Sequence, residues 1–161
     1  HLLGSGAILN EAIGAQEILE SQYGVGADVW SVTSYKELYT DALETQRWNR
    51  LHPREEPKKC YVQECFEGQE GVFVAASDYV KALPCLISEW LPGRLVALGT
   101  DGFGRSDTRA ALREYFEVDR RFITLAALSA LADEGTIQPE KVQKAIEDMN
   151  LNPDKISPLA V

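Results

Sequence analysis

The sequence predicts an α/β fold in which helices cover a mostly parallel central sheet. Strand-like and helix-like patterns alternate four times along the 161 residues, and this alternation is typical of parallel strands joined by crossover helices. The run Val72–Ala76 is apolar without interruption, as expected of a strand buried on both faces. With 45% hydrophobic and 25% charged residues, residues 1–161 are expected to form a single packed domain.

The chain opens on a strand and a helix. Leu2-Leu3 predicts the end of a short strand, which Gly4-Ser5-Gly6 stops. Apolar residues then recur at helical spacing, and Gly24 and Gly26 are expected to end this helix. The apolar stripe of the helix consists of Ile8, Ala12, Ala15 and Leu19.

A second strand and helix follow. Val29–Val32 is strand-like, and Ser34 with Glu37 matches a capping box, in which each side chain satisfies a backbone N–H at the helix start. The helix is expected to run to about Asn49. The polar, proline-bearing segment Leu51–Gly71 then predicts a long connection.

The middle of the chain predicts two further strands. Within the long connection, Cys60–Val62 is a candidate for a short extended piece. After the strand Val72–Ala76, Ser77-Asp78 is expected to cap a helix, which Pro84 either kinks or delays. Leu95–Leu98 is the fourth strand.

Three helices are expected after the fourth strand. A glycine-rich corner over 99–107 leads into the first of them, from about Asp107 to Tyr115. The second runs from about Asp119 to Asp133. The third begins near Pro139, a favourable residue for a first helical turn, and Asn152-Pro153 closes it.

The composition and net charge of the chain argue against some kinds of binding partner. The net charge of −9 and a pI of about 4.7 disfavour nucleic acid and anionic membranes. No apolar run approaches the roughly 18 residues that span a membrane, and no secretory signal is visible. Three cysteines are an odd count at irregular spacing, which indicates a reducing cytoplasm. The chain lacks an initiator Met, so we expect it to begin inside a domain.

Single residues that could act in catalysis or bind a metal give only weak signals in this sequence. His52 is either a catalytic base or, as we favour, a loop histidine that packs or caps, since no nucleophile elbow accompanies it. Cys60 and Cys65 with His52 lack the second close pair of ligands that zinc sites usually have. Cys85 falls among apolar helical positions and is expected to pack in the core.

The corner over 99–107 is the best local candidate for a site. Three glycines in six residues permit a sharp turn, and positive φ is expected at Gly102 or Gly104. The corner is either an anion site or a tight interface turn; we favour the turn, because the spacing matches no phosphate-binding motif. We expect Ser106 or Asp107 to cap the following helix, and Arg105 or Arg109 to pair with a carboxylate. The candidate residues are Asp101, Arg105, Ser106, Asp107, Arg109 and His52.

Several segments together resemble the C-terminal domain of the homodimeric bacterial pyruvate dehydrogenase, the decarboxylase component of its complex. The match covers nearly the whole chain in order. It is most specific at Leu98–Asp107 and Trp48–Pro53, within the matching segments Leu98–Arg109 and Arg47–Pro53. The other matching segments are Leu2–Leu9, Tyr23–Ser34, Ala76–Tyr79, Phe116–Asp119 and Pro139–Pro158.

The resemblance implies the transketolase-type C-terminal fold, a three-layer α/β/α sandwich. The family's domain has five strands, the first antiparallel, and this chain is expected to start after that strand. The expected order of the four remaining strands is second, first, third, fourth. Leu2-Leu3 and Val72–Ala76 would then be the central strands.

The resemblance also implies what the whole subunit does. It would use thiamine diphosphate and magnesium to convert pyruvate to carbon dioxide, and would pass the acetyl group to lipoyl-lysine. The family's Gly-Asp-Gly and Asn-Asn cofactor motifs do not occur here, so we expect this segment to bind no cofactor and to be inactive alone. Its implied partners are the rest of its own subunit, a homodimer partner and the dihydrolipoyl acetyltransferase core.

Two alternatives remain open on the sequence alone. The chain is the same domain of another thiamine diphosphate enzyme, such as a different 2-oxo acid dehydrogenase or a transketolase. Otherwise it is a free-standing interaction or anion-binding domain. The pyruvate dehydrogenase interpretation, which we favour, implies a structural role for the domain. If the corner over 99–107 has a role beyond folding, it lies at a contact between subunits or is an anion site that faces the cofactor domains, and we favour the contact.

Overall fold

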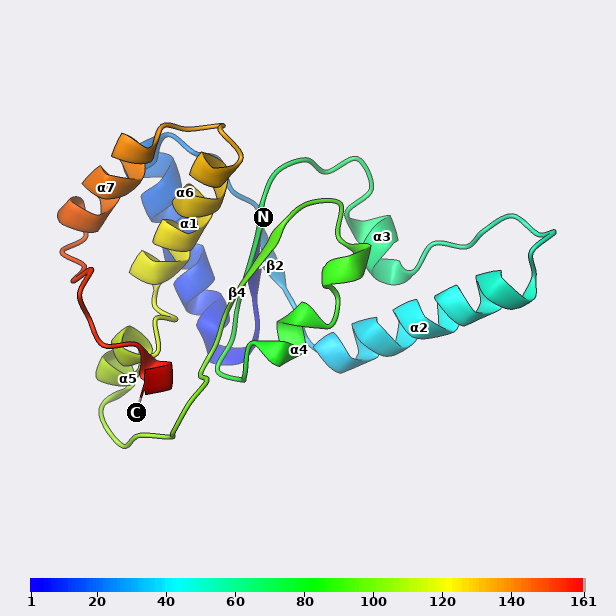
Figure 1. Cartoon of the computed structure of the whole chain (residues 1–161), viewed down its shortest axis with the longest axis horizontal. Helices are drawn as coiled ribbons and strands as arrows, with labels where there is room; N and C mark the ends of the chain where they lie inside the picture. The colour runs from blue at the N-terminus through cyan, green and yellow to red at the C-terminus, as the bar shows by residue number, and fades with distance from the viewer. Residues whose placement is uncertain (161) are drawn as a thin grey trace.

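The computed structural model describes residues 1–160 as a parallel sheet between two layers of helices (Figure 1). The strands are β1 (Leu2–Gly4), β2 (Val29–Ser31), β3 (Phe73–Ala76) and β4 (Leu95–Leu98). The α-helices are α1 (Leu9–Tyr23), α2 (Tyr35–Leu51), α3 (Tyr61–Cys65), α4 (Ala82–Cys85), α5 (Arg109–Tyr115), α6 (Arg120–Asp133) and α7 (Pro139–Asp148). Short 3₁₀ turns occur at Gly6–Ile8, Ser88–Trp90 and Pro158–Ala160.

The sheet has the order β2-β1-β3-β4, and every pairing is parallel. Leu2 pairs with Val29 on one side and Val74 on the other, so β1 is central. The predicted strand order and the predicted central strands are therefore confirmed. All four residues of β3 are buried, as its uninterrupted apolar sequence predicts.

Alternate side chains of the strands supply two separate cores. Leu2 and Val74 face α1, α6 and α7, while Leu3 and Phe73 face the side of α2, α3 and α4. The first core includes Ile8, Ala12, Ala15, Leu19, Ile123 and Leu128; the second includes Tyr35, Ala42, Val62, Phe66 and Ile87. The structure thus has the three layers that the family resemblance implies.

Several helix ends follow the expected chemistry. Gly24 ends α1 in the left-handed conformation at φ 63°, which only glycine adopts without strain. The Ser34 hydroxyl accepts a hydrogen bond from the Glu37 N–H at 3.2 Å at the start of α2. The Asp119 carboxylate accepts from the N–H groups of Arg121 and Phe122 and so caps α6.

The expected helix cap after β3 is wrong. Ser77-Asp78 does not cap a helix: the Ser77 hydroxyl accepts from the Tyr79 N–H within a turn, and α4 begins only at Ala82. Pro84, which has no backbone N–H to donate, lies in the first turn of α4, where that N–H would have no partner within the helix. The late start that Pro84 was expected to cause is therefore present, but the capping residues are not.

Two expectations for the cysteines are also wrong. Cys60–Val62 is not extended, because Cys60 is the N-cap of α3 and the two residues after it are helical. Cys85 is exposed rather than in the core. The helix that carries it is only one turn long, so the apolar stripe expected from the spacing does not form there.

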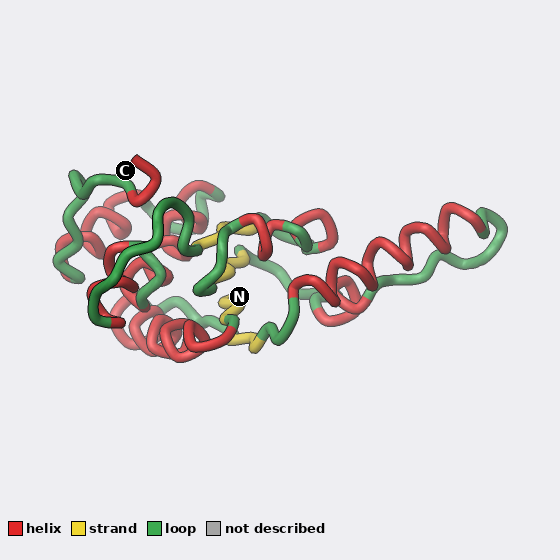
Figure 2. Tube along the Cα trace, turned by 90° about the horizontal axis from the view of Figure 1, so that it is seen from below, coloured by secondary structure: helices red, strands yellow, loops and turns green. Residues whose placement is uncertain are grey.

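The second half of α2 leaves the body of the domain. α2 and the segment that returns from it project well beyond the sheet (Figures 1 and 2). Tyr35 and Ala42 are buried against the body, whereas residues 51–59 are all exposed. No helix among residues 1–160 is both long and apolar enough to cross a membrane.

The close approach of β1 to α1 gives a test of this packing. A Cβ on Gly4 would lie 2.6 Å from the Leu9 Cα, so the backbone must move to accept Gly4→Ala. We expect a loss of about 1 to 3 kcal/mol in the free energy of unfolding, measured by urea denaturation. Gly26→Ala is the control, because Gly26 is exposed and its added Cβ has no neighbour within 4 Å. Equal stability of the two variants would contradict this account.

Candidate functional site

The turns after β1, β3 and β4 meet α5 at the carboxyl edge of the sheet. Between them lies a cavity of about 630 Å³. This edge is where open α/β sheets usually place their ligand or contact sites. The lining residues include Ala7, Asp78, Thr100, Arg105, Asp107, Arg109 and Arg113.

The start of the glycine-rich loop 99–107 is hydrogen-bonded to the turn after β3. The Thr100 N–H donates to the Tyr79 carbonyl at 2.9 Å. Asp101 accepts a hydrogen bond from the Lys81 N–H at 3.1 Å, and the Lys81 Nζ lies 3.8 Å from its other carboxylate oxygen. The sequence candidate Asp101 is therefore an anchor of the loop.

The middle of the loop lies under the end of the chain. Gly102 has φ 92°, which confirms the predicted positive φ. A Cβ there would lie 2.5 Å from the Pro158 carbonyl oxygen, so the close approach also requires glycine. The segment around Pro158 lies beside this loop, near α5 (Figure 1).

The predicted cap of α5 is wrong by one or two residues. Thr108, in an extended conformation, is the N-cap, and its hydroxyl accepts from the Ala111 N–H at 3.3 Å. Asp107 instead accepts a hydrogen bond from the Thr108 N–H at 2.6 Å. Ser106 lines a neighbouring hollow of about 560 Å³ and is exposed.

The predicted pairing of Arg105 or Arg109 with a carboxylate is also wrong. Among residues 1–160, neither guanidinium has an acidic partner within 4 Å. Arg105 lies over the ring of Tyr115, 4.6 Å from its centre, in a cation–π contact. The aromatic ring at the end of α5 thus takes the place of the expected carboxylate.

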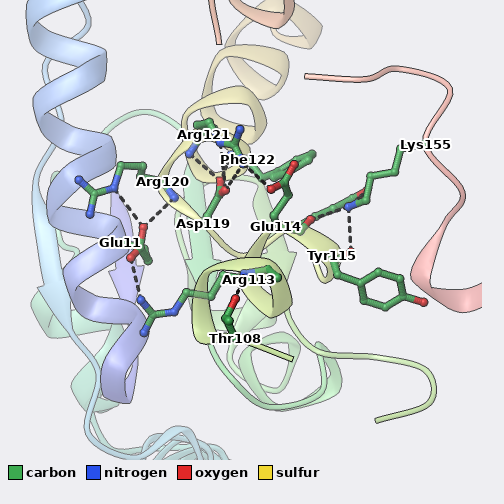
Figure 3. A network of polar contacts seen from close by, with 12 residues as sticks. Glu11, Thr108, Arg113, Glu114, Tyr115, Asp119, Arg120, Arg121, Phe122 and Lys155 are labelled. Atoms are coloured by element: carbon green, nitrogen blue, oxygen red, sulfur yellow. Dashed lines mark hydrogen bonds and ion pairs between the residues drawn. The ribbon is translucent and has the colours of Figure 1, made fainter. Parts of the chain in front are cut away.

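Glu11, which the sequence analysis missed, holds α5 and α6 to α1. Its carboxylate accepts from the Arg113 guanidinium at 2.9 Å and from both the Nε and the backbone N–H of Arg120 at 3.1 Å (Figure 3). Only 8% of Glu11 is exposed. A signal was present, because Glu11 lies on the buried face of α1, three residues after Ile8 and four before Ala15.

The pKa of Glu11 reflects two opposing effects. Burial raises the pKa, while hydrogen bonds from the side chain and backbone of Arg120 and the charges of Arg120 and Arg113 lower it. The lowering effects prevail, so the folded state favours the ionised carboxylate. Glu11 is therefore expected to stabilise the fold most above the acidic range.

Lys155 fixes the opposite end of α5. Its Nζ donates to the carbonyls of Glu114 and Tyr115 at 2.5 and 2.8 Å and lies 3.4 Å from the Glu117 carboxylate (Figure 3). A lysine at a helix C-terminus satisfies carbonyls that have no partner within the helix. The final segment of the chain is thus tied to the same helix that lines the cavity.

His52 does not belong to this edge. It follows α2, whose end lies on the other side of the molecule from α5 (Figure 1). Its ring stacks on Trp48 at 4.4 Å, and its Nδ1 lies 2.8 Å from the Trp48 carbonyl oxygen. In the structure His52 therefore packs against and caps the end of α2.

The charges that line the cavity are mixed. Three arginines line it, but Arg113 is already paired with Glu11, and Asp78 and Asp107 line the same cavity. The attraction for an anion is largely offset. Within residues 1–160 no group of three or more His, Cys, Asp or Glu side chains is placed to hold a metal ion.

This arrangement defines an α/β domain of the transketolase type. A model of the transketolase-like TK C-terminal domain matches residues 1–119, and the chain belongs to that family. A solved structure described as a split gene transketolase, inactive beta4 tetramer, shares the fold with a TM-score of 0.55 and 22% identity. That alignment covers 81% of this chain and 38% of the other.

Curated relatives specify the branch of the family. The chain is 51% identical over 159 residues to the pyruvate dehydrogenase E1 component of Pseudomonas aeruginosa and 44% identical over 158 residues to that of Escherichia coli K12. The corresponding protein of Mycolicibacterium smegmatis is 38% identical over 151 residues. These matches cover 94–98% of this chain but only 16–18% of each relative. The resemblance stated from the sequence is confirmed.

Glu11→Gln tests the link between α1, α5 and α6. At pH 7 we expect a loss of about 2 kcal/mol in the free energy of unfolding, less than for a fully buried pair because Arg120 is half exposed. The folded pKa is lowered, so the contribution of Glu11 is complete above its unfolded pKa of about 4.3 and is lost as pH falls through the folded value.

Urea denaturation from pH 7 to pH 3 measures this difference. The gap between wild type and Glu11→Gln should shrink towards pH 3. Glu20→Gln, an exposed change on the same helix, should have little effect at any pH. A gap that stays constant across the range would contradict the assigned role of the charge.

Proposed function

We propose that this chain is the C-terminal domain of a pyruvate dehydrogenase decarboxylase subunit. The whole subunit converts pyruvate to carbon dioxide and passes the acetyl group to lipoyl-lysine. The observation that carries this proposal is the alignment of 98% of the chain, at 51% identity, with a pyruvate dehydrogenase E1 component. The chain spans about a fifth of such relatives. In this proposal residues 1–161 are one domain of a larger multidomain enzyme.

The cofactor of that enzyme belongs to other parts of the subunit. Thiamine diphosphate and magnesium require a diphosphate-binding motif and oxygen ligands, and the residues of this chain do not fit them. Neither Gly-Asp-Gly nor Asn-Asn occurs in the sequence. The domain therefore contributes assembly and support, and no catalytic step is assigned to its residues.

The carboxyl edge of the sheet has the surface that an assembly role requires. Phe103 in the glycine-rich loop is 80% exposed, and further exposed apolar side chains lie on the turn after β3 and on the final segment of the chain. They are Tyr79, Val80, Ile156 and Leu159. Exposed apolar residues concentrated in this way mark contact surfaces. We assign this edge to contacts within the assembled enzyme, a cytoplasmic homodimer that joins an acetyltransferase core.

The proposed activity is tested on the full-length parent. A steady-state assay compares pyruvate, 2-oxoglutarate and sugar phosphates as substrates, with thiamine diphosphate and magnesium supplied. We expect turnover of pyruvate at least about a hundredfold more efficient than that of the others, since an active site that rejects the wrong substrate loses several kcal/mol of transition-state binding. Preference for any other substrate would refute the proposal.

Arg105→Ala in the full-length parent tests the role of the edge. Removing the guanidinium frees Tyr115 and loosens the loop, so dimerisation or cofactor retention should weaken about tenfold while the Michaelis constant for pyruvate changes little. Sedimentation and steady-state kinetics measure both. Lys144→Ala, an exposed change on α7, is the control. Unchanged assembly with a sharply raised Michaelis constant would place the loop at the substrate instead.

A further inference from the structure

The last part of the chain forms a separate feature, which we call the strap and define as residues 152–160. It runs from the end of α7 back to α5 and the glycine-rich loop (Figure 1). Leu151, just before the strap, packs against the core that α1, α6 and α7 enclose. Within the strap no residue is buried, and only Lys155 and Pro158 are partly shielded from solvent. The strap therefore lies on the surface of the domain.

Internal turns give the strap a shape of its own. The Asn152 side chain accepts a hydrogen bond from the Asp154 N–H at 3.0 Å, and the Ser157 hydroxyl accepts one from the Leu159 N–H at 3.2 Å. Short polar side chains stabilise turns in this way without help from the rest of the fold. Among the described residues, no backbone–backbone hydrogen bond joins the strap to the body of the domain. The strap can therefore lift away from the body without breaking a strand or a helix.

A single polar side chain fastens the strap to the body. The Lys155 Nζ donates to the carbonyls of Glu114 and Tyr115, and it lies 3.4 Å from the Glu117 carboxylate (Figure 3). The three N–H groups of the ammonium thus have three acceptors. Only 22% of the lysine side chain is exposed. In the part of the chain that the structure describes, no other side chain of the strap is hydrogen-bonded or ion-paired to the body.

The strap also rests on the middle of the glycine-rich loop. A Cβ on Gly102 would lie 2.5 Å from the Pro158 carbonyl oxygen and 3.8 Å from the Leu159 Cα. The backbones of the loop and the strap are therefore in direct contact at this point. Phe103, the next residue of the loop, is 80% exposed. The strap thus limits the movement of the loop segment that carries Phe103.

The exposure of its side chains indicates what keeps the strap closed. Ile156 is 71% exposed and Leu159 is 63% exposed, so burial of apolar area contributes little. Hydrogen bonds from a charged donor are stronger than those between neutral groups, and Lys155 makes such bonds to the end of α5. A segment with few buried apolar contacts opens far more readily than the whole domain unfolds. Closure of the strap therefore depends on the Lys155 ammonium.

We propose that the strap is a latch on the glycine-rich loop, with a closed and an open state. In the closed state Lys155 binds the end of α5 and Pro158 covers Gly102, so the loop keeps Phe103 in one position. In the open state both contacts are lost together, and the middle of the loop moves between its anchored ends. The latch acts on the carboxyl edge, which the proposed function assigns to contacts, but its two states follow from the residues of this chain alone.

Proteolysis of the full-length parent by thermolysin tests the latch. Thermolysin cleaves before large apolar residues and needs several residues of unfolded chain. When opening and closing are fast, the rate of cleavage follows the population of the open state. Cleavage before Phe103 reports on the loop, and cleavage before Ile156 reports on the strap. Mass spectrometry of the denatured digest separates the two products.

Each variant is read at the element whose sequence it leaves unchanged. Lys155→Met removes the ammonium from the strap but keeps a side chain of similar length, so cleavage of the loop before Phe103 should rise about tenfold. Gly102→Ala places a Cβ of the loop against the Pro158 carbonyl, so cleavage of the strap before Ile156 should rise about tenfold.

The chain offers a matched control for each variant. Gly104→Ala changes the same loop, but its added Cβ has no neighbour within 4 Å, and Lys144→Met removes a charge from the exposed face of α7. Both controls should cleave within about threefold of the wild type, and circular dichroism should show every variant folded. Unchanged loop cleavage in Lys155→Met, or unchanged strap cleavage in Gly102→Ala, would overturn the latch. Either result leaves the proposed function intact, because the assay with pyruvate tests it separately.

Discussion

The arrangement of the carboxyl edge depends on one buried carboxylate. Glu11 lies on the core-facing side of α1 and binds arginines from α5 and from the start of α6. A buried ion pair contributes little net stability compared with apolar packing, because desolvation offsets the attraction. The main effect of Glu11 is to orient the helices. Its two carboxylate oxygens bind Arg113 and Arg120 at about 3 Å each, and these bonds determine where α5 lies on the body. Gly14 completes the fit, because a Cβ there would collide with the Arg120 guanidinium at 2.7 Å.

From α5 the constraint extends to the middle and the end of the glycine-rich loop. Tyr115 on α5 holds Arg105, and Lys155 holds the last carbonyls of the same helix. The segment after Lys155 then passes over Gly102, where only a hydrogen fits beneath the Pro158 carbonyl. A loop held at so many points presents Phe103 to solvent at little entropic cost, which is the condition for a strong contact residue.

The sequence predicts features whose causes are local. Uninterrupted apolar runs identify β3 and β4, Gly24 ends α1, and Gly102 takes positive φ, because each depends on a few adjacent residues. The strand order came from family resemblance, since periodicity alone does not specify which strands are neighbours. Glu11 was missed because its partners lie more than 100 residues away. The cap of α5 was misplaced because three consecutive polar residues can each cap a helix, and only the tertiary position of the loop selects Thr108.

The two surfaces outside the core differ in chemistry and lie at opposite ends of the molecule. The carboxyl edge is rich in exposed apolar side chains around Phe103. Residues 43–59, the projecting end of α2 with the segment that returns from it, instead have five basic and three acidic side chains and extend from the far side of the sheet (Figure 1). Two remote surfaces on a rigid α/β body allow one domain to contact two other bodies at once, and their different chemistry keeps the two contacts from competing. In the enzyme proposed above, the carboxyl edge would contact the other parts of the assembled enzyme. A cofactor site built from several parts depends on contacts of this kind to hold its geometry.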